Sequence, residues 1–195
     1  MTVKRFRSYE VADEPEGYQP TICEAAMATS AATSFFDPVA IGPAGQQYAD
    51  GALVANNPVR EVWTEAQNIW DLRDGKIEER VKCIVSIGTG DPGMKPLPDS
   101  MTGLVSAMVS LVTTTKAEAS DFADNHRNLL RDGRYFRFNV QQGLQDVGLA
   151  EYKQKAKMTT ATEDYLREQE MKQKLEICTA GLSEKDCTYA VEDFS

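Results

Sequence analysis

An aspartate at the end of a short predicted strand is the residue of this chain best suited to chemistry. Asp50 follows the strand predicted at residues 46–49, and Gly51 comes directly after it. Glycine lets the backbone turn sharply and lets another group approach closely, so the carboxylate would be held at a rigid strand end. A general base is positioned in this way. The same Asp-Gly pair is also common in ordinary turns, and the local pattern alone favours that plainer interpretation.

Two other features could carry chemistry, and each has a plainer structural interpretation. His126, the single histidine, lies in a polar stretch predicted to be helical, which indicates a solvated surface residue outside any catalytic triad. Gly88, Thr89 and Gly90 follow an apolar run but lack the lysine and the spacing of a phosphate-binding loop. We therefore interpret these three residues as a turn.

The cysteines indicate neither a metal site nor a disulfide framework. Cys23, Cys83, Cys178 and Cys187 match no zinc signature. Cys23 and Cys83 lie in apolar runs and are predicted to be small buried hydrophobic residues. We expect reduced thiols in a cytoplasmic protein, and chemistry without a metal or a cofactor.

The strands and helices that must position these residues alternate along the chain. Strands are predicted at 6–11, 46–49, 81–87 and 135–140, and helices at 25–34, 59–72, 104–130 and 161–180. Three helix starts are predicted from capping residues: Thr21 with Glu24, Asn57 before Pro58, and Thr160 with Glu163. Gly181 is predicted to end the last helix. The apolar run at 81–87 suits a central strand buried on both faces. The order predicts an α/β fold of three layers, with helices on both faces of a largely parallel sheet.

Length and charge limit the function further. The 195 residues suit one domain, predicted at 1–182, with an acidic tail at 183–195. The 30 acidic and 21 basic residues give a net charge of −9, which disfavours nucleic-acid binding and broad docking on anionic membranes. The longest apolar stretch, at 104–112, is too short to span a membrane. It is predicted to be either a helix packed on the sheet or, as an alternative, a lid that contacts lipid locally.

Two stretches, in order, resemble the patatin-like phospholipase family. Residues 24–36 (EAAMATSAATSFF) are similar to the family's EAxxATSAAPxxF helix, and residues 50–59 (DGALVANNPV) are similar to its DGA/G motif and the NNP segment that follows. The strands at Phe6 and at Ser86 also occur in the family's order, so the resemblance runs from about Phe6 to Gly90 and more loosely to Ala180. The chain is thus identified as the C-terminal part of a patatin-like domain, with a three-layer α/β/α fold that is incomplete on its N-terminal side.

The resemblance implies a serine lipid acyl hydrolase with a Ser-Asp dyad. Asp50 would be the general base, within the motif formed by Asp50, Gly51 and Ala52, and the substrate would be a lipid or phospholipid ester. The serine in a G-x-S-x-G elbow and the glycine-rich oxyanion loop of the family are not found in the 195 residues. Without a nucleophile we expect this chain to be inactive alone.

A second hypothesis comes from a different functional class. The chain could act as a non-catalytic module that binds lipid or protein, with transient contact at a membrane surface. A sheet without its first strands exposes an edge and an apolar face that favour association. No substrate-binding residue and no oligomeric state is assigned from the sequence.

Overall fold

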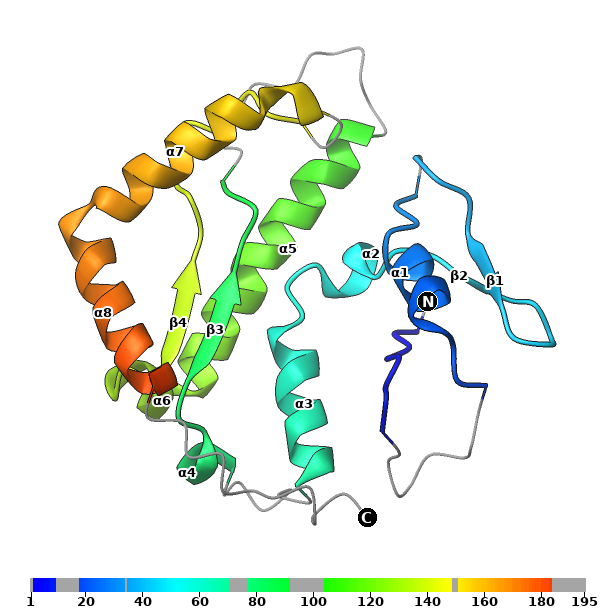
Figure 1. Ribbon diagram of the computed structural model, residues 1–195, viewed down its shortest axis with the longest axis horizontal. Coiled ribbons are helices and arrows are strands. Elements are labelled where there is room, and N and C mark those ends of the chain that lie inside the picture. Colours follow the sequence, from blue (N-terminus) through cyan, green and yellow to red (C-terminus); the bar gives the residue numbers. More distant parts are fainter. Residues whose placement is uncertain are drawn as a thin grey trace. The chain divides into compact units, whose positions relative to one another are not determined.

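The structure is a computed structural model that forms two compact units (Figure 1). It describes residues 2–9, 18–33, 35–70, 77–91, 104–148 and 151–183, with only the backbone for Leu53 and residues 104–113. The first unit comprises Met1–Leu72 and Pro98–Glu118, and the second comprises Arg73–Leu97 and Ala119–Ser195. Each unit combines helices with a two-stranded sheet, which confirms the α/β class. The predicted loop at 92–100 and the predicted tail after Ser183 lie outside the described residues.

Helix α1 (Ile22–Thr29) begins where its capping signal predicts. The Glu24 backbone N–H donates to Thr21 Oγ1 at 3.2 Å, and the Thr21 backbone N–H donates to the Glu24 carboxylate at 2.8 Å. These bonds satisfy two N–H groups that the first helical turn leaves without partners. The helix ends at Ser30, earlier than predicted. Ala28 and Ala31 are 1% and 2% exposed, and their small size allows close packing in the core of the first unit.

Strands β1 (Val39–Ile41) and β2 (Gln46–Tyr48) form an antiparallel hairpin in the first unit, with Ile41 opposite Gln46. Gly42 and Gly45 in the connecting loop have positive φ angles of 76° and 61°, which glycine adopts without strain. The sequence predicted β2 but gave no signal for β1, which has three residues.

Helix α3 (Val59–Ile69) buries Val59 and Trp63 of the apolar face predicted for it. Val62 and Trp70, which were predicted to lie on the same face, are 58% and 44% exposed. The predicted cap at Asn57 is wrong, because Pro58 occupies the N-cap position and no side chain caps the helix. The reason is the short helix α2 (Ala52–Ala55), which was not predicted and whose helical backbone continues through Asn56. Asn57 therefore lies between two helices, is 5% exposed, and makes no N-cap hydrogen bond to α3.

The described part of the predicted N-terminal strand, residues 6–9, is extended but pairs with no other strand. The Phe6 ring instead meets the Tyr48 ring edge-on, with centroids 5.2 Å apart. Arg7 Nη2 donates to Glu65 Oε2 of α3 at 2.8 Å. Side-chain contacts with β2 and α3 thus hold this segment in place of a hydrogen-bonded ladder.

In the second unit, strand β3 (Ile84–Ile87) pairs in parallel with β4 (Tyr135–Phe138). The prediction that β3 is buried on both faces is wrong, because Val85 is 37% exposed and Ile87 is 77% exposed. The apolar residues that bury this sheet lie on β4 instead: Tyr135 is 4% exposed and Phe136 is 3% exposed.

The two long helices predicted for the C-terminal half are each broken. The first is α5 (Leu104–Asn125) followed by α6 (Arg127–Arg131), with His126 between them at φ −122° and ψ 48°. The second is a 3₁₀ turn, η1 (Tyr152–Gln154), followed by α7 (Lys155–Arg167) and α8 (Gln169–Ser183). Thr160 is not a cap but an internal residue of α7, where its hydroxyl donates to the Ala156 carbonyl at 3.1 Å. Gly181 does not end the helix, because α8 continues to Ser183.

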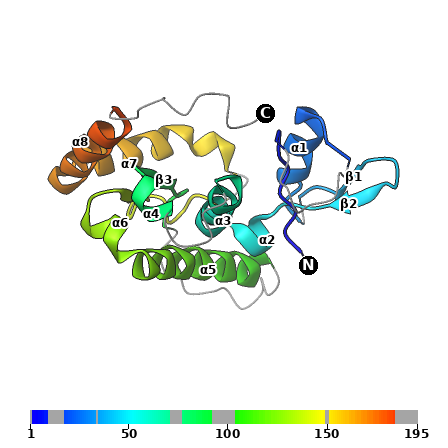
Figure 2. The same ribbon diagram turned by 90° about the horizontal axis from the view of Figure 1, so that it is seen from below.

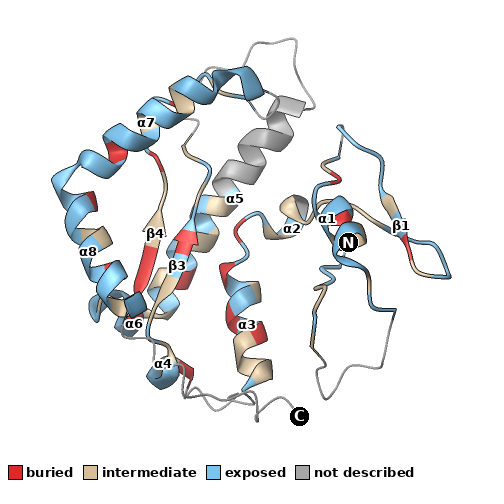
Figure 3. Cartoon of the chain, viewed as in Figure 1, coloured by how far each residue is buried: buried red, intermediate tan, exposed pale blue. Residues whose placement is uncertain are grey.

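Helices lie on both faces of the β3–β4 sheet (Figure 2). The end of α5 contributes Phe122, whose ring lies 5.1 Å from that of Tyr135, and α6 contributes the fully buried Leu129. On the other face, Tyr165 of α7 and Met171 of α8 pack with Val140 and Leu144. Buried residues therefore line the inner sides of these helices, and exposed residues line their outer sides (Figure 3). This layering is the one that the sequence predicts. Helix α4 (Ile77–Arg80) precedes β3 and buries Ile77 completely.

Candidate active-site segment around Asp50

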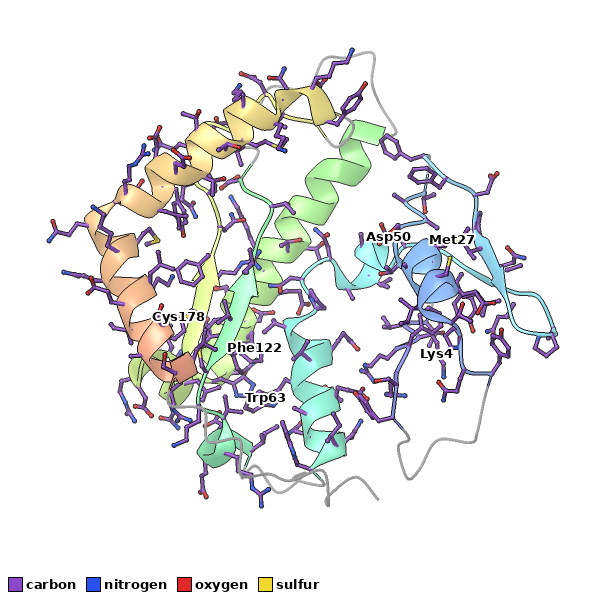
Figure 4. The ribbon with its side chains drawn as sticks, in the orientation of Figure 1. Lys4, Met27, Asp50, Trp63, Phe122 and Cys178 are labelled. Carbon is purple, nitrogen blue, oxygen red and sulfur yellow. The ribbon has the colours of Figure 1, made fainter. Side chains whose placement is uncertain are left out.

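The structure places Asp50 between β2 and α2, beside the end of α1 (Figure 4). The Asp50 backbone N–H donates to the carbonyl oxygen of Ala31 at 3.0 Å. Ala31 follows α1 and is 2% exposed, so this bond is made in the core of the first unit. The two stretches singled out in the sequence, residues 24–36 and 50–59, are therefore in direct contact.

A hydrogen bond holds one of the two oxygens of the Asp50 carboxylate. Oδ1 accepts a hydrogen bond from the backbone N–H of Ala52 at 2.8 Å. Oδ2 makes no hydrogen bond with any residue that the structure describes, and the side chain is partly exposed. An oriented carboxylate with one oxygen still available can accept a proton from a hydroxyl placed beside it.

Gly51 does not have the sharp backbone that the sequence suggested. Its φ of −65° and ψ of −12° lie in the right-handed helical region, because α2 begins at the next residue. A Cβ atom at Gly51 would meet nothing within 4 Å among the described residues. The glycine therefore leaves open space beside Asp50 and relieves no strained conformation.

Two polar contacts hold the segment after Asp50 on α5. Asn56 Nδ2 donates to Thr115 Oγ1 at 2.6 Å, and Arg60 Nε lies 2.9 Å from Glu118 Oε2. Both contacts lie within the first unit and join residues 58 or 59 positions apart. The sequence gave no signal for them, since only the fold brings these residues together.

His126 is neither a fully solvated residue nor a partner of Asp50 in any recorded contact. It is partly buried in the second unit, where Nδ1 lies 2.7 Å from Glu78 Oε1. Its ring lies 4.4 Å from the Phe122 ring. The prediction of a surface histidine without partners is wrong, because the break between α5 and α6 turns the side chain inward against Phe122.

Residues 88–90 do not form the predicted turn, because the Gly88 and Asp91 N–H groups donate to the carbonyl oxygens of Phe138 and Val140 and hold this segment along the chain that follows β4. Gly90 has a φ of 103°, and its backbone N–H donates to Asn139 Oδ1 at 3.0 Å. A Cβ atom at Gly88 would lie 2.0 Å from that same Asn139 oxygen, so close approach of this side chain requires glycine here.

No group of three or more potential metal ligands occurs among the described residues. Cys23, predicted to be buried, is exposed because it lies on the solvent side of the first turn of α1; Cys83 is partly buried and Cys178 is buried. None of these three described cysteines forms a disulfide. Within the described residues, no helix is both long enough and apolar enough to cross a membrane.

Comparisons with known proteins agree with the motifs. The sequence model of the family described as Patatin-like phospholipase matches residues 1–63, a segment that includes Asp50 and both resembling stretches. A protein named Phospholipase A I from Arabidopsis thaliana is 29% identical over 119 residues. The alignment covers 60% of this chain but only 8% of that relative. Over residues 1–63, the chain is therefore similar to the patatin-like phospholipase family.

Proposed function

We propose that this chain is part of a lipid acyl hydrolase and that Asp50 is its general base. The carrying observation is the Asp50 carboxylate itself, held through Oδ1 by the Ala52 N–H with Oδ2 left available. The position of Asp50 within a segment that matches the family supports this role. The substrate would be a lipid or phospholipid ester, hydrolysed without a metal or a cofactor.

The proposed reaction follows the chemistry of a Ser-Asp dyad. Asp50 Oδ2 accepts the proton of a serine hydroxyl as the serine oxygen attacks the ester carbonyl. The carbon–oxygen bond to the leaving alcohol breaks, and the alcohol takes up the proton. Water, deprotonated in turn by the same carboxylate, then attacks the acyl-serine. The bond between the acyl carbon and the serine oxygen breaks, the serine oxygen takes the proton back from Asp50, and the fatty acid is released. Hydrogen-bond donors of an oxyanion hole stabilise the negative charge on the carbonyl oxygen in both steps.

The serine and the oxyanion donors would come from residues outside this sequence. The 195 residues contain no G-x-S-x-G segment. We therefore expect the chain alone to show no esterase activity and a domain that also supplies the serine elbow to be active. A cytoplasmic location, with at most peripheral contact at membranes, belongs to the same proposal and is checked by cell fractionation.

Hydrolysis of a short-chain p-nitrophenyl ester tests this function. The chain alone and a domain completed by a G-x-S-x-G segment are each assayed, together with Asp50→Asn. Asparagine retains Oδ1 as an acceptor for the Ala52 N–H but cannot take up the serine proton, so the fold should survive while activity falls at least 100-fold. Activity of the chain alone, or full activity of the Asp50→Asn domain, would contradict the proposal.

A non-catalytic module remains the second candidate because large apolar side chains are exposed in the first unit. Ile22 and Met27 on α1 are 91% and 56% exposed, and Phe36 after α1 is 68% exposed. Such residues suit contact with lipid or with a protein partner. Binding of the chain alone to phosphatidylcholine vesicles, weakened by Phe36→Ser but unaffected by Asp50→Asn, would favour the module.

A further inference from the structure

A polar cluster lies at the carboxyl end of the β3–β4 sheet and is separate from the contacts of Asp50. Arg137 of β4 stands opposite Ser86 of β3, and Arg137 Nη1 donates to Ser86 Oγ at 2.8 Å. Tyr135 precedes Arg137 by two residues, so the two side chains share one face of the sheet. Ligand sites in parallel sheets form at the carboxyl ends of the strands, and Ser86 and Arg137 lie near those ends. Tyr135 is the first residue of β4, and its hydroxyl lies near Ser86.

The charge of Arg137 has no anionic partner among the described residues. Its guanidinium is partly buried, which lowers its pKa, and the phenol groups of Tyr135 and Tyr165 lie near it. No described carboxylate lies within ion-pair distance of Arg137. Removing a cation from water costs free energy unless an anion compensates it, so this position favours an anion supplied from outside.

A second donor beside Arg137 also lacks a partner. Tyr135 is 4% exposed, and its hydroxyl makes no well-formed hydrogen bond with any described residue, although it lies near Ser86. Burial raises the pKa of Tyr135, so the phenol keeps its proton and can donate it to a hydrogen bond.

The glycine segment after β3 packs closely against this cluster. A Cβ atom at Gly88 would lie 2.7 Å from Arg137 Nη2, so any larger residue would displace the guanidinium. Asn139 Oδ1 accepts the Gly90 N–H at 3.0 Å and holds this segment over the end of the sheet. Lys174 is occupied elsewhere, since its Nζ donates to the Arg137 carbonyl oxygen at 2.7 Å. The Arg137 guanidinium therefore lies directly beside Gly88, and Arg137 is partly exposed.

We propose that this end of the β3–β4 sheet binds a phosphate-type oxyanion, with Arg137 and the Tyr135 hydroxyl as donors. The guanidinium presents planar N–H groups that fit two oxygens of one phosphate. The anion is either a free phosphate or the phosphate of a lipid head group. The site does not depend on Asp50, so it stands whether or not the proposed hydrolase function is correct.

Titration of the ¹⁵N-labelled chain with inorganic phosphate tests the site directly. Chloride at matched ionic strength serves as the reference. Saturable NMR shifts are expected at the backbone amides of Gly88 to Gly90 and at Arg137 Nε–H. Because this measurement uses the unaltered chain, no variant has to fold for the result to count. Shifts that are absent there, or that appear only at exposed lysines, would overturn the proposal.

Variants then identify the cation. Arg137→Gln should weaken phosphate binding at least tenfold. Arg131→Gln should leave it unchanged, because the Arg131 side chain is 76% exposed and pairs with exposed Asp132. If Arg137→Gln fails to fold, Arg137→Lys is used instead. Lysine keeps the charge but lacks the planar N–H groups of the guanidinium, so binding should still weaken. Equal affinity in all folded variants would refute the role of Arg137.

Vesicles distinguish the two sources of phosphate. Arg137-dependent binding to vesicles of phosphatidylcholine with phosphatidic acid, but not to phosphatidylcholine alone, would assign a lipid head group. Binding to inorganic phosphate without vesicle binding would assign a free phosphate. Asp50→Asn should change neither result, so a failure of this site and a failure of the proposed hydrolase are told apart.

Discussion

Removing the charge of Glu65 should destabilise the first unit more than any exposed ion pair does. Glu65 lies on α3 with its side chain 12% exposed, and Arg7 opposite it has its side chain 9% exposed. Glu65 Oε2 accepts from Arg7 Nη2 at 2.8 Å and lies 3.5 Å from Arg5 Nε, and Oε1 accepts from the Tyr9 hydroxyl at 3.1 Å. Glu65→Gln keeps the shape but removes the negative charge that faces the Arg7 guanidinium.

The magnitude follows from this burial. Breaking a fully buried ion pair by removing one partner costs about 3–5 kcal/mol. The Glu65 side chain retains some contact with water, so we expect a loss of about 2–3 kcal/mol in the free energy of unfolding. The control is Glu163→Gln on α7, where Arg167 lies 2.8 Å away but both side chains are more than half exposed. That change should cost less than about 0.5 kcal/mol.

Acid should remove the same contribution. The hydrogen bonds from Arg7, and then the one from Tyr9, hold the pKa of Glu65 below its ordinary value despite the opposing effect of burial. A depressed carboxyl pKa adds stability above the pKa of the unfolded chain, and this stability is lost as the pH falls through the folded pKa. Stability should therefore decrease below about pH 4.5 in the unaltered chain and less steeply in Glu65→Gln.

Urea unfolding followed by tryptophan fluorescence measures both effects. Trp63 lies on α3 two residues before Glu65 and is 9% exposed. Trp70 is the C-cap residue of the same helix. The signal therefore reports on the first unit. A Glu65→Gln chain that loses no more stability than Glu163→Gln would refute the reasoning, because the pair would then behave as a solvated one.

Two further predictions concern the second unit. Leu129→Ala should lower the free energy of unfolding by about 2–5 kcal/mol, because Leu129 is completely buried. Leu130→Ala should lower it by less than about 1 kcal/mol, because Leu130 is 52% exposed. Thermal unfolding followed by circular dichroism measures both changes. Burial, together with the neighbouring Cys178 thiol, raises the pKa of Cys83 to about 11, so iodoacetamide at pH 8 should alkylate exposed Cys23 well before Cys83 or Cys178. Mass-spectrometric mapping over time checks the order, and equal rates at Cys23 and Cys83 would contradict it.

The local sequence predicted a helix start or a strand where interactions between neighbouring residues determine it. Thr21 and Glu24 form the predicted capping box because both partners lie within one turn. The strands at β2, β3 and β4 also follow from short apolar or alternating runs. The capping box is decided within one turn, whereas the runs of β3 and β4 predict each strand but not their pairing, which joins residues 51 positions apart.

Predictions failed where distant contacts decide the backbone. Residues 6–9 alternate like a strand, yet their side chains are held by Tyr48 and Glu65, about 40 to 60 positions away. His126 has no helix-breaking chemistry of its own, but its contacts with Glu78 and Phe122 accompany the break between α5 and α6. Helix propensity is a weak preference that such tertiary contacts override.

The same distinction separates the two proposed sites. Asp50, Gly51 and Ala52 are consecutive, so the sequence alone singled them out, and the Ala52 N–H to Asp50 bond is equally local. The Arg137 cluster joins residues 51 positions apart, and strand register alone makes it. A slip of one residue between β3 and β4 would turn every side chain of the slipped strand to the opposite face. Ser86 and Arg137 would then no longer meet, so phosphate binding that depends on Arg137 would also be evidence for the observed register.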